Sequence, residues 1–182
     1  MTGTSRRAPD GSADGSCSRS ATKGAIVSES CSVCRRVKDE EESGLVVYRS
    51  PHVVLYHMPE VDLPGYLVLA TVRHEESLGS LTDEEIVAMA RVEQHAVKAL
   101  LEFPHVRKVY LASFGEVCAH THFHLFPRTD EMLEAISSWT DGEIDGPRIF
   151  DTFRKALKTT GTPGPVFEIV QRLRSLFAEQ SG

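Results

Sequence analysis

Three histidines lie within five residues of one another, at His120, His122 and His124. Side chains alternate between the two faces of a β-strand, so residues spaced by two share one face, with Cα atoms roughly 6.6–6.8 Å apart. Imidazole is a competent nucleophile, proton carrier and metal ligand near neutral pH. The spacing therefore predicts either one small ligand shared by the three rings or separate tasks divided among them.

Two simpler interpretations of the histidine triplet remain open on the residues alone. The rings could line a solvated face of an edge strand, although Phe123 and Leu125 give the opposite face an apolar character. They could also form a metal site made of histidine only. The apolar opposite face and the Leu-Phe-Pro that follows the triplet argue against a solvated edge.

A second chemical signal is the pair Cys31 and Cys34, separated by two residues just ahead of the first expected strand. A Cys-x-x-Cys pair fits zinc binding, redox chemistry or simple apolar packing. Structural zinc needs four tetrahedral ligands, of which this pair supplies two. Cys118, two residues before His120, is either a substitute ligand or a packed core thiol.

Composition excludes several classes of protein. The chain has 182 residues, 41% hydrophobic and 25% charged, which fits one globular domain. No stretch reaches the ~20 apolar residues of a membrane span. The formal charge of -6 disfavours a protein that holds long nucleic acid. The four cysteines are too few and too irregularly spaced for a disulfide framework, which favours a reducing, cytoplasmic location.

The hydrophobic pattern predicts an α+β domain with a mainly antiparallel five-stranded sheet. Thr82 and Glu85 form a capping box that starts a long helix, expected to run from Asp83 to Phe103. Its apolar face is expected to comprise Ile86, Met89, Ala90, Val97 and Leu100. The expected strands are 44–49, 53–57, 66–72, 107–114 and 119–127, the last ended by its proline.

Three regions are expected along the chain. Residues 1–27 carry almost no large apolar side chains and are predicted to be a disordered leader. Residues 28–128 hold the main domain. Residues 129–182 form a C-terminal extension, irregular at first and ending in an amphipathic helix over 165–178.

The histidine strand resembles the signature of the histidine-triad (HIT) family. The matching residues are 120–126 (HTHFHLF) followed by Pro127-Arg128, with Thr121 at a position that is usually hydrophobic. Upstream, 64–69 (PGYLVL) leading to Arg73-His74 is similar to the family strand that ends in a basic residue and histidine. The resemblance covers roughly residues 31–128 and implies a HIT-like fold.

The resemblance implies a covalent phosphoryl mechanism at the histidines. His122 would attack the α-phosphorus of a nucleotide-like substrate, giving a nucleotidyl-histidine that water then releases. His124 would donate to the phosphate oxygens. Transferase-like and phosphorylase-like branches carry Gln at this third position, so His124 favours a hydrolase.

The family's phosphate-contacting loop corresponds to residues 113–116. Gly115 would let the backbone approach the ligand, Ser113 would donate to phosphate, and Glu116 would orient a water or a histidine. Many family members have Asn and Gln near these positions. Met58 stands where the family often has a ribose-binding acid, so ribose recognition is weakened or moved to Glu60 or Asp62.

Zinc-bearing members of the family complete their site with the basic-His step and the first triad histidine. By resemblance, Cys31, Cys34, His74 and His120 would hold a structural Zn²⁺. The long helix would pair two copies of the chain into a homodimer.

Three functions remain in view at this point. The first is a zinc-containing hydrolase, or a nucleotidyltransferase or phosphorylase of the same superfamily. The second is a HIT protein that binds a nucleotide without turnover, and the third is a module in which histidines and cysteines serve metal alone. A small nucleotide-like molecule is the expected partner in the first two.

Overall fold

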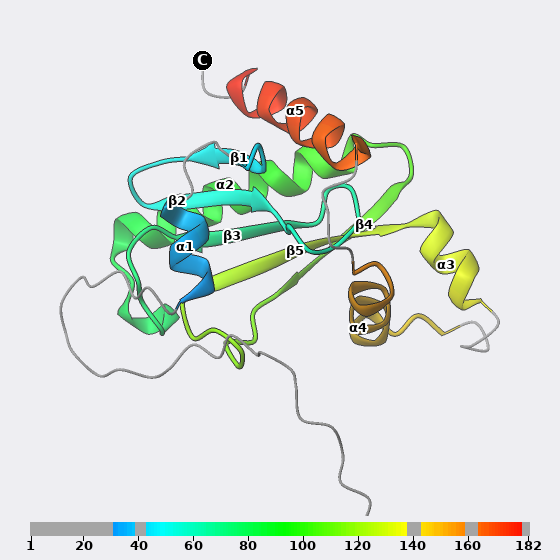
Figure 1. The fold of residues 1–182 in the computed structure, drawn as a ribbon, viewed down its shortest axis with the longest axis horizontal. Helices are drawn as coiled ribbons and strands as arrows, with labels where there is room; N and C mark the ends of the chain where they lie inside the picture. Colours follow the sequence, from blue (N-terminus) through cyan, green and yellow to red (C-terminus); the bar gives the residue numbers. More distant parts are fainter. Residues whose placement is uncertain (1–30, 39–42, 138–142, 159–163, 180–182) are drawn as a thin grey trace, which may run out of the picture.

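The computed structural model describes residues 31–38, 43–137, 143–158 and 164–179, and contains one five-stranded sheet (Figure 1). The strand order is β1-β2-β3-β5-β4, and every neighbouring pair is antiparallel. The strands are β1 (Val46–Arg49), β2 (Val53–His57), β3 (Leu67–Thr71), β4 (Val106–Ala112) and β5 (His122–Thr129). The predicted α+β architecture is therefore confirmed.

Helices α2 (Asp83–Leu101) and α5 (Gly164–Glu179) cover one face of the sheet (Figure 1). Odd-numbered strand residues such as Leu55, Leu69 and Leu125 point into this layer and are fully buried. Helix α5 adds a stripe of apolar side chains at Val166, Ile169, Val170, Leu173, Leu176 and Phe177. The C-terminal helix thus belongs to the main core.

The opposite face is covered in two parts. Helix α1 (Ser32–Lys38) packs over even-numbered residues of β2 and β3, including Val54 and Ala70. Helices α3 (Asp130–Ile136) and α4 (Gly146–Ala156) enclose a cluster around Tyr66 and Phe126. Because β2 and β3 are buried on both faces, their sequences are continuous apolar runs rather than alternating ones.

Strand β5 begins later and ends later than its sequence predicts. It starts at His122 rather than Ala119, so His120 lies in the segment that leads into it. It also continues through Pro127 to Thr129. Strand β3 accompanies β5 only as far as Leu125, so Pro127 is bordered by β4 alone, where a missing N–H is tolerated.

The buried stripe of α2 agrees only in part with the expected one, since Met89 and Leu100 are buried as predicted. Ile86 and Ala90 are exposed, whereas Glu85 is buried beside Met89. A carboxylate occupies the inward position because it pairs with a cation, a contact that hydrophobic periodicity does not reveal.

Three helices were missed by the sequence pattern. The Cys pair begins α1, and the irregular region after residue 129 contains α3 and α4. A 3₁₀ turn, Leu78–Ser80, also precedes α2. Short helices of seven to eleven residues give few turns of periodicity, and their stability comes mainly from tertiary packing. The expected leader, residues 1–27, lies outside the described residues.

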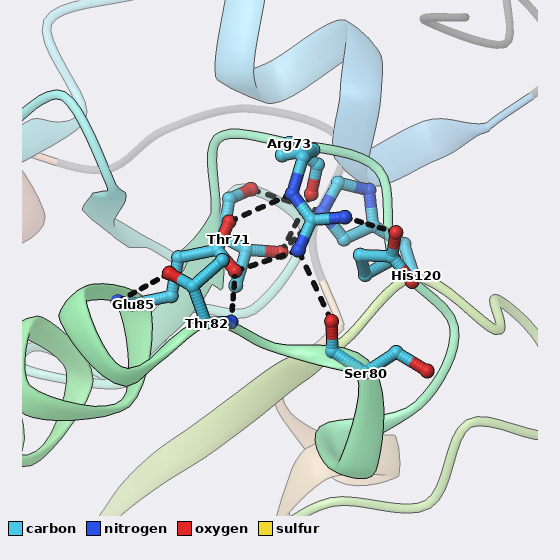
Figure 2. A network of polar contacts seen from close by, with 7 residues as sticks. Thr71, Arg73, Ser80, Thr82, Glu85 and His120 are labelled. Atoms are coloured by element: carbon cyan, nitrogen blue, oxygen red, sulfur yellow. Dashed lines mark hydrogen bonds and ion pairs between the residues drawn. The ribbon is translucent and has the colours of Figure 1, made fainter. Parts of the chain in front are cut away.

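An ion pair ties the start of α2 to the segment after β3 (Figure 2). The Arg73 guanidinium donates to both oxygens of Glu85, at 3.0 and 2.7 Å, and to the Ser80 carbonyl at 3.2 Å. The same Glu85 accepts from the Thr82 N–H at 2.8 Å, which completes the capping box. The network fixes the backbone next to His74.

We expect Glu85→Gln to lower the free energy of unfolding at pH 7 by about 2 kcal/mol, because the charge-assisted bonds to Arg73 are lost while a capping amide remains. The Arg73 guanidinium lowers the pKa of Glu85 below 4.5. Its stabilising contribution is therefore present above pH 4.5 and lost as pH falls through the folded-state pKa. Urea unfolding at several pH values would show the difference between the two proteins shrinking below pH 4.5.

Asp83→Asn is the matched control, since it removes a carboxylate from the same helical turn at an exposed position. A Glu85→Gln protein as stable as the control at pH 7 would contradict the importance of this ion pair.

Candidate functional site

Four metal-binding side chains converge between α1 and the ends of β3 and β5. One ligand atom from each of Cys31, Cys34, His74 and His120 lies within 4.8 Å of the other three. The Cys34 sulfur is 3.1 Å from Nδ1 of His74 and 3.4 Å from Nδ1 of His120. The Cys31 sulfur is 3.6 Å from the same His120 nitrogen. The residues predicted as a metal site are brought together.

Local backbone structure places the two cysteines. Cys31 precedes α1, and its sulfur accepts from the Cys34 N–H at 3.4 Å, so the first helical turn folds around the thiol. At the other end of α1, Arg49 donates to the Val37 carbonyl at 2.6 Å. The helix is therefore attached to β1, and both thiols face the sheet.

Hydrogen bonds to Thr71 determine which nitrogen of His120 is free (Figure 2). Nε2 of the ring lies 2.9 Å from the Thr71 carbonyl and 3.0 Å from its hydroxyl oxygen. The hydroxyl itself donates to the Arg73 carbonyl, so Nε2 of His120 is the donor and carries the proton. Nδ1 then presents a lone pair to the cysteines, as metal-binding histidines require.

The donor set fits a tetrahedral metal ion. Ligand atoms around zinc are about 3.3–3.8 Å apart when bond lengths are about 2.3 Å to sulfur and 2.0 Å to nitrogen. The measured separations of 3.1–3.6 Å lie near that range. Without a cation, contact with the Cys118 thiol and burial raise the pKa of Cys31. A bound cation would reverse this effect by stabilising the thiolate.

Cys118 lies beside the metal cluster. Its sulfur is 3.3 Å from that of Cys31, and the side chain is buried. It is not one of the four residues whose ligand atoms all lie within 4.8 Å of one another. Its position fits a packed core thiol in contact with one ligand.

The nucleophile predicted by resemblance, His122, has one ring nitrogen held and one available. Its Nδ1 lies 2.6 Å from the His120 carbonyl, and this backbone oxygen can only accept. Nδ1 therefore carries the proton, and Nε2 keeps its lone pair. The rings of His122 and His124 lie edge to face, with centroids 5.0 Å apart.

His124 is oriented by Tyr66, a residue that the sequence did not single out. The Tyr66 hydroxyl is 3.0 Å from Nδ1 of His124. Burial raises the pKa of Tyr66, so the hydroxyl keeps its proton and is able to donate it to this nitrogen. Burial, with smaller effects from His122 and Arg154, lowers the pKa of His124 to about 4. His124 is therefore neutral at pH 7, and a hydrogen bond donated by Tyr66 to Nδ1 would leave the ring proton on Nε2.

The connection between β4 and β5 carries the residues expected to contact phosphate. Ser113, Gly115 and Glu116 are exposed there, and Gly115 has a φ of 70°, which favours glycine. Phe114, between them, places its ring 6.4 Å from that of His124. The loop thus borders the histidines. Met58, at the expected acid position, packs partly buried against the apolar clusters.

The HIT domain model matches residues 39–131, just over half of the chain. The chain belongs to the HIT domain family. No curated protein matches its sequence with significance.

Solved structures share the fold of this HIT domain protein at low sequence identity. A Zn-bound histidine triad family protein from Mycobacterium smegmatis is 16% identical, with a TM-score of 0.55, covering 83% of this chain and 95% of its own. A Hit-like protein involved in cell-cycle regulation from Bartonella henselae is 17% identical, with a TM-score of 0.54, and the match covers 79% of this chain and 93% of that protein. A uridylyltransferase mutant is 19% identical, with a TM-score of 0.53, and the match covers 82% of this chain and 48% of that protein.

The sequence did not predict several residues that contact the histidines of the site. Thr71 and Tyr66 act on histidines that are 49 and 58 residues away along the chain. Phe150 of α4 lies 5.9 Å from the His124 ring, measured between centroids. The only sequence signal for Tyr66 was its place in the strand that resembles the family.

We expect Cys34→Ser to lose bound metal and to melt at a clearly lower temperature, because a structural zinc contributes folding free energy and the site loses a thiolate. Metal content by mass spectrometry and thermal unfolding would measure both effects. Cys118→Ser is the matched control, a buried thiol beside the cluster, and should retain one metal per chain. Equal metal content in Cys34→Ser and wild type would show that the assignment is wrong.

Proposed function

We propose that this HIT domain protein is a hydrolase of nucleotide-type phosphoric esters, anhydrides or phosphoramidates that acts through a covalent nucleotidyl-histidine on His122. The observation that carries the proposal is the 2.6 Å contact between Nδ1 of His122 and the His120 carbonyl. This contact places the ring proton on Nδ1 and leaves Nε2 unprotonated. The backbone carbonyl also fixes the orientation of the His122 ring. A neutral imidazole held in this tautomer is a nucleophile near pH 7.

The reaction has two displacement steps. Nε2 of His122 forms a bond to the α-phosphorus, and the bond from phosphorus to the leaving group breaks, with the electron pair departing on that group. The ring becomes positively charged, and the His120 carbonyl stabilises its Nδ1 proton. Water then attacks the same phosphorus, its proton is released to solvent, and the His122 lone pair is restored with release of a nucleoside monophosphate.

His124 supports this chemistry as a neutral donor. With Tyr66 as the donor to Nδ1, the Nε2 proton of His124 is available to a phosphate oxygen. The exposed residues Ser113, Gly115 and Glu116 border the same space and are proposed to contact substrate. Histidine rather than glutamine at position 124 favours water over another nucleotide acceptor as the second reactant.

We propose zinc as the metal held by Cys31, Cys34, His74 and His120, with a structural role. Two thiolates and two imidazoles are a donor set that zinc prefers. All four positions are filled by protein atoms, which leaves no place for substrate on the ion. The metal would brace the segment from which β5 begins, and with it the carbonyl that orients His122.

We expect His122→Asn to abolish turnover while the fold is retained, because the neighbouring histidines cannot take over the nucleophilic role from their own places. A panel of nucleoside phosphoramidates and dinucleoside polyphosphates would measure turnover. Intact-mass spectrometry after an alkaline denaturing quench, which preserves the acid-labile bond between phosphorus and the ring nitrogen, would detect the adduct on wild type and not on His122→Asn.

His124→Ala is the comparison variant for that experiment. It removes a charge-stabilising donor and should lower the rate by about 100- to 1000-fold while the adduct on His122 still forms. Turnover by His122→Asn close to that of wild type would overturn the proposed nucleophile. Binding of nucleotides by wild type with no adduct and no turnover would favour a non-catalytic nucleotide-binding protein.

We also propose that the protein is a homodimer in a reducing, cytoplasmic compartment. Exposed apolar side chains lie on α2, at Ile86, Val87 and Leu101, and on the edge strand β4 at Leu111. An edge strand with apolar neighbours is a ready surface for pairing with another chain.

None of the described helices is both long and apolar enough to span a membrane.

Sedimentation velocity at micromolar concentration should give a mass of about twice 20.1 kDa. Leu111→Glu should shift the protein toward monomer, because it buries a charge in the proposed interface. Ile144→Glu, at an equally exposed apolar position before α4, should leave the mass unchanged. A wild-type monomer under these conditions would contradict the dimer.

A further inference from the structure

Helix α4 lies outside the matched HIT domain yet packs against the third histidine of the triad. The Phe150 ring is 5.9 Å from the ring of His124, 5.7 Å from Phe114 and 6.2 Å from Tyr66, measured between centroids. One side chain of the C-terminal region thus contacts the histidine, its hydroxyl partner and the adjoining loop. Helix α4 forms part of the wall beside His124.

Both ends of α4 are held in place. At its start, Asp145 caps the helix by accepting from the Arg148 N–H at 3.1 Å. Gly146 lies so close to Tyr110 of β4 that an added Cβ would be 3.3 Å from the ring. At its end, the Asp62 N–H donates to the Leu157 carbonyl at 2.7 Å. The helix therefore holds its side chains in defined positions relative to the sheet.

Arg154 is one helical turn after Phe150, on the same face of α4. Its guanidinium carbon is 5.9 Å from the centre of the Phe150 ring. The buried Nε of Arg154 has no hydrogen-bond partner among the described residues. The Arg154 side chain is 37% exposed overall, so Nε is its buried part and carries a donor without a protein acceptor in the described part of the chain.

The one ion pair of Arg154 among the described residues is weak. Its guanidinium is 3.7 Å from Asp151, whereas Lys155 approaches the same carboxylate to 2.6 Å. Asp151 is half exposed, which screens the pair further. Most of the hydrogen-bonding capacity of Arg154 is therefore available to a ligand.

The positive charge of Arg154 acts electrostatically on His124 and Tyr66. It lowers the pKa of His124 and acts in the same direction on Tyr66. Burial keeps His124 neutral, so this histidine contributes a donor but no full positive charge to an anionic substrate. Among the described residues, Arg154 is the cation whose field reaches both His124 and Tyr66.

We propose that Arg154 binds a charged phosphate group of the substrate next to the phosphorus attacked by His122. The inference deepens the proposed function and rests on it for the identity of the reacting phosphorus. It predicts that the protein prefers substrates whose leaving group carries phosphate over those whose leaving group is an uncharged amine. Arginine suits this role because its planar fork matches phosphate oxygens.

A purely structural role for Arg154 makes a different prediction. If the guanidinium only packed on Phe150, its removal would change stability and leave anion binding intact. Arg154→Met separates the two roles, because methionine keeps an unbranched apolar stem over the ring and removes the charge. Arg154→Lys keeps the charge but loses the bidentate fork.

Isothermal titration of the metal-loaded protein with inorganic pyrophosphate tests the site without turnover. Arg154→Met should weaken binding at least tenfold, and Arg154→Lys should fall between it and wild type. Lys155→Met is the matched control, because it removes an exposed charge one residue later, and it should bind within twofold of wild type. Thermal unfolding would confirm that each variant is folded.

Turnover provides the second arm of the test. Arg154→Met should lower kcat/KM at least tenfold on a dinucleoside triphosphate, and less than threefold on a nucleoside phosphoramidate of the same base with an ammonia leaving group. Equal losses on both substrates would overturn the preference for a charged leaving group. Pyrophosphate binding that is absent in wild type, unchanged in Arg154→Met or equally weakened in Lys155→Met would overturn the site itself.

Failure of the proposed function gives a different pattern. Wild type would then show no turnover and no adduct on His122, whereas pyrophosphate binding would still depend on Arg154. The two hypotheses are therefore separable within one set of variants.

Discussion

The hydrogen bond from His120 to the Thr71 carbonyl is the contact on which both chemical sites depend. By occupying Nε2 it turns Nδ1 toward the two cysteines. The carbonyl of the same residue accepts from His122 and sets the tautomer of the proposed nucleophile. Because one residue serves both sites, loss of the metal cluster would also displace the acceptor that prepares His122. The side chain of His120 thus serves the metal cluster, while its backbone carbonyl orients the side chain of His122.

A polar network outside the cluster supports this arrangement. Arg73 follows β3 directly and binds Glu85 at the start of α2, while Thr71 bonds to both the Arg73 carbonyl and His120. The cap of the long helix is therefore connected through three residues to the metal cluster. Glu85 is the buried partner and Arg73 is a third exposed, so loss of the arginine would leave a buried carboxylate without its cation and destabilise the fold. The network explains why the backbone next to His74 is well positioned although it belongs to a loop.

Around the second and third histidines, aromatic packing determines the chemistry. Tyr66 and Phe150 exclude water from one side of His124, and this burial keeps the ring neutral. A neutral ring donates a hydrogen bond but cannot balance a phosphate charge, so a separate cation is needed nearby. In our proposal Arg154 supplies that cation, from a helix beyond the matched domain. The division between donor and cation follows from burial of the histidine.

Local patterns in the sequence were sufficient to predict that five strands, the long capped helix and the amphipathic C-terminal helix exist, because periodicity and capping act over a few residues; the bounds of β5 were wrong. The resemblance to the family also identified all four residues of the metal cluster. The tertiary structure alone decided which atoms face one another: the tautomers of His120 and His122, the hydroxyl of Tyr66 on His124, and the inward turn of Glu85. It also decided that Pro127 lies within β5, that α4 packs Phe150 against His124, and that Arg154 lies over the Phe150 ring. These features depend on contacts between residues far apart in the chain, and periodicity carries no information about such contacts.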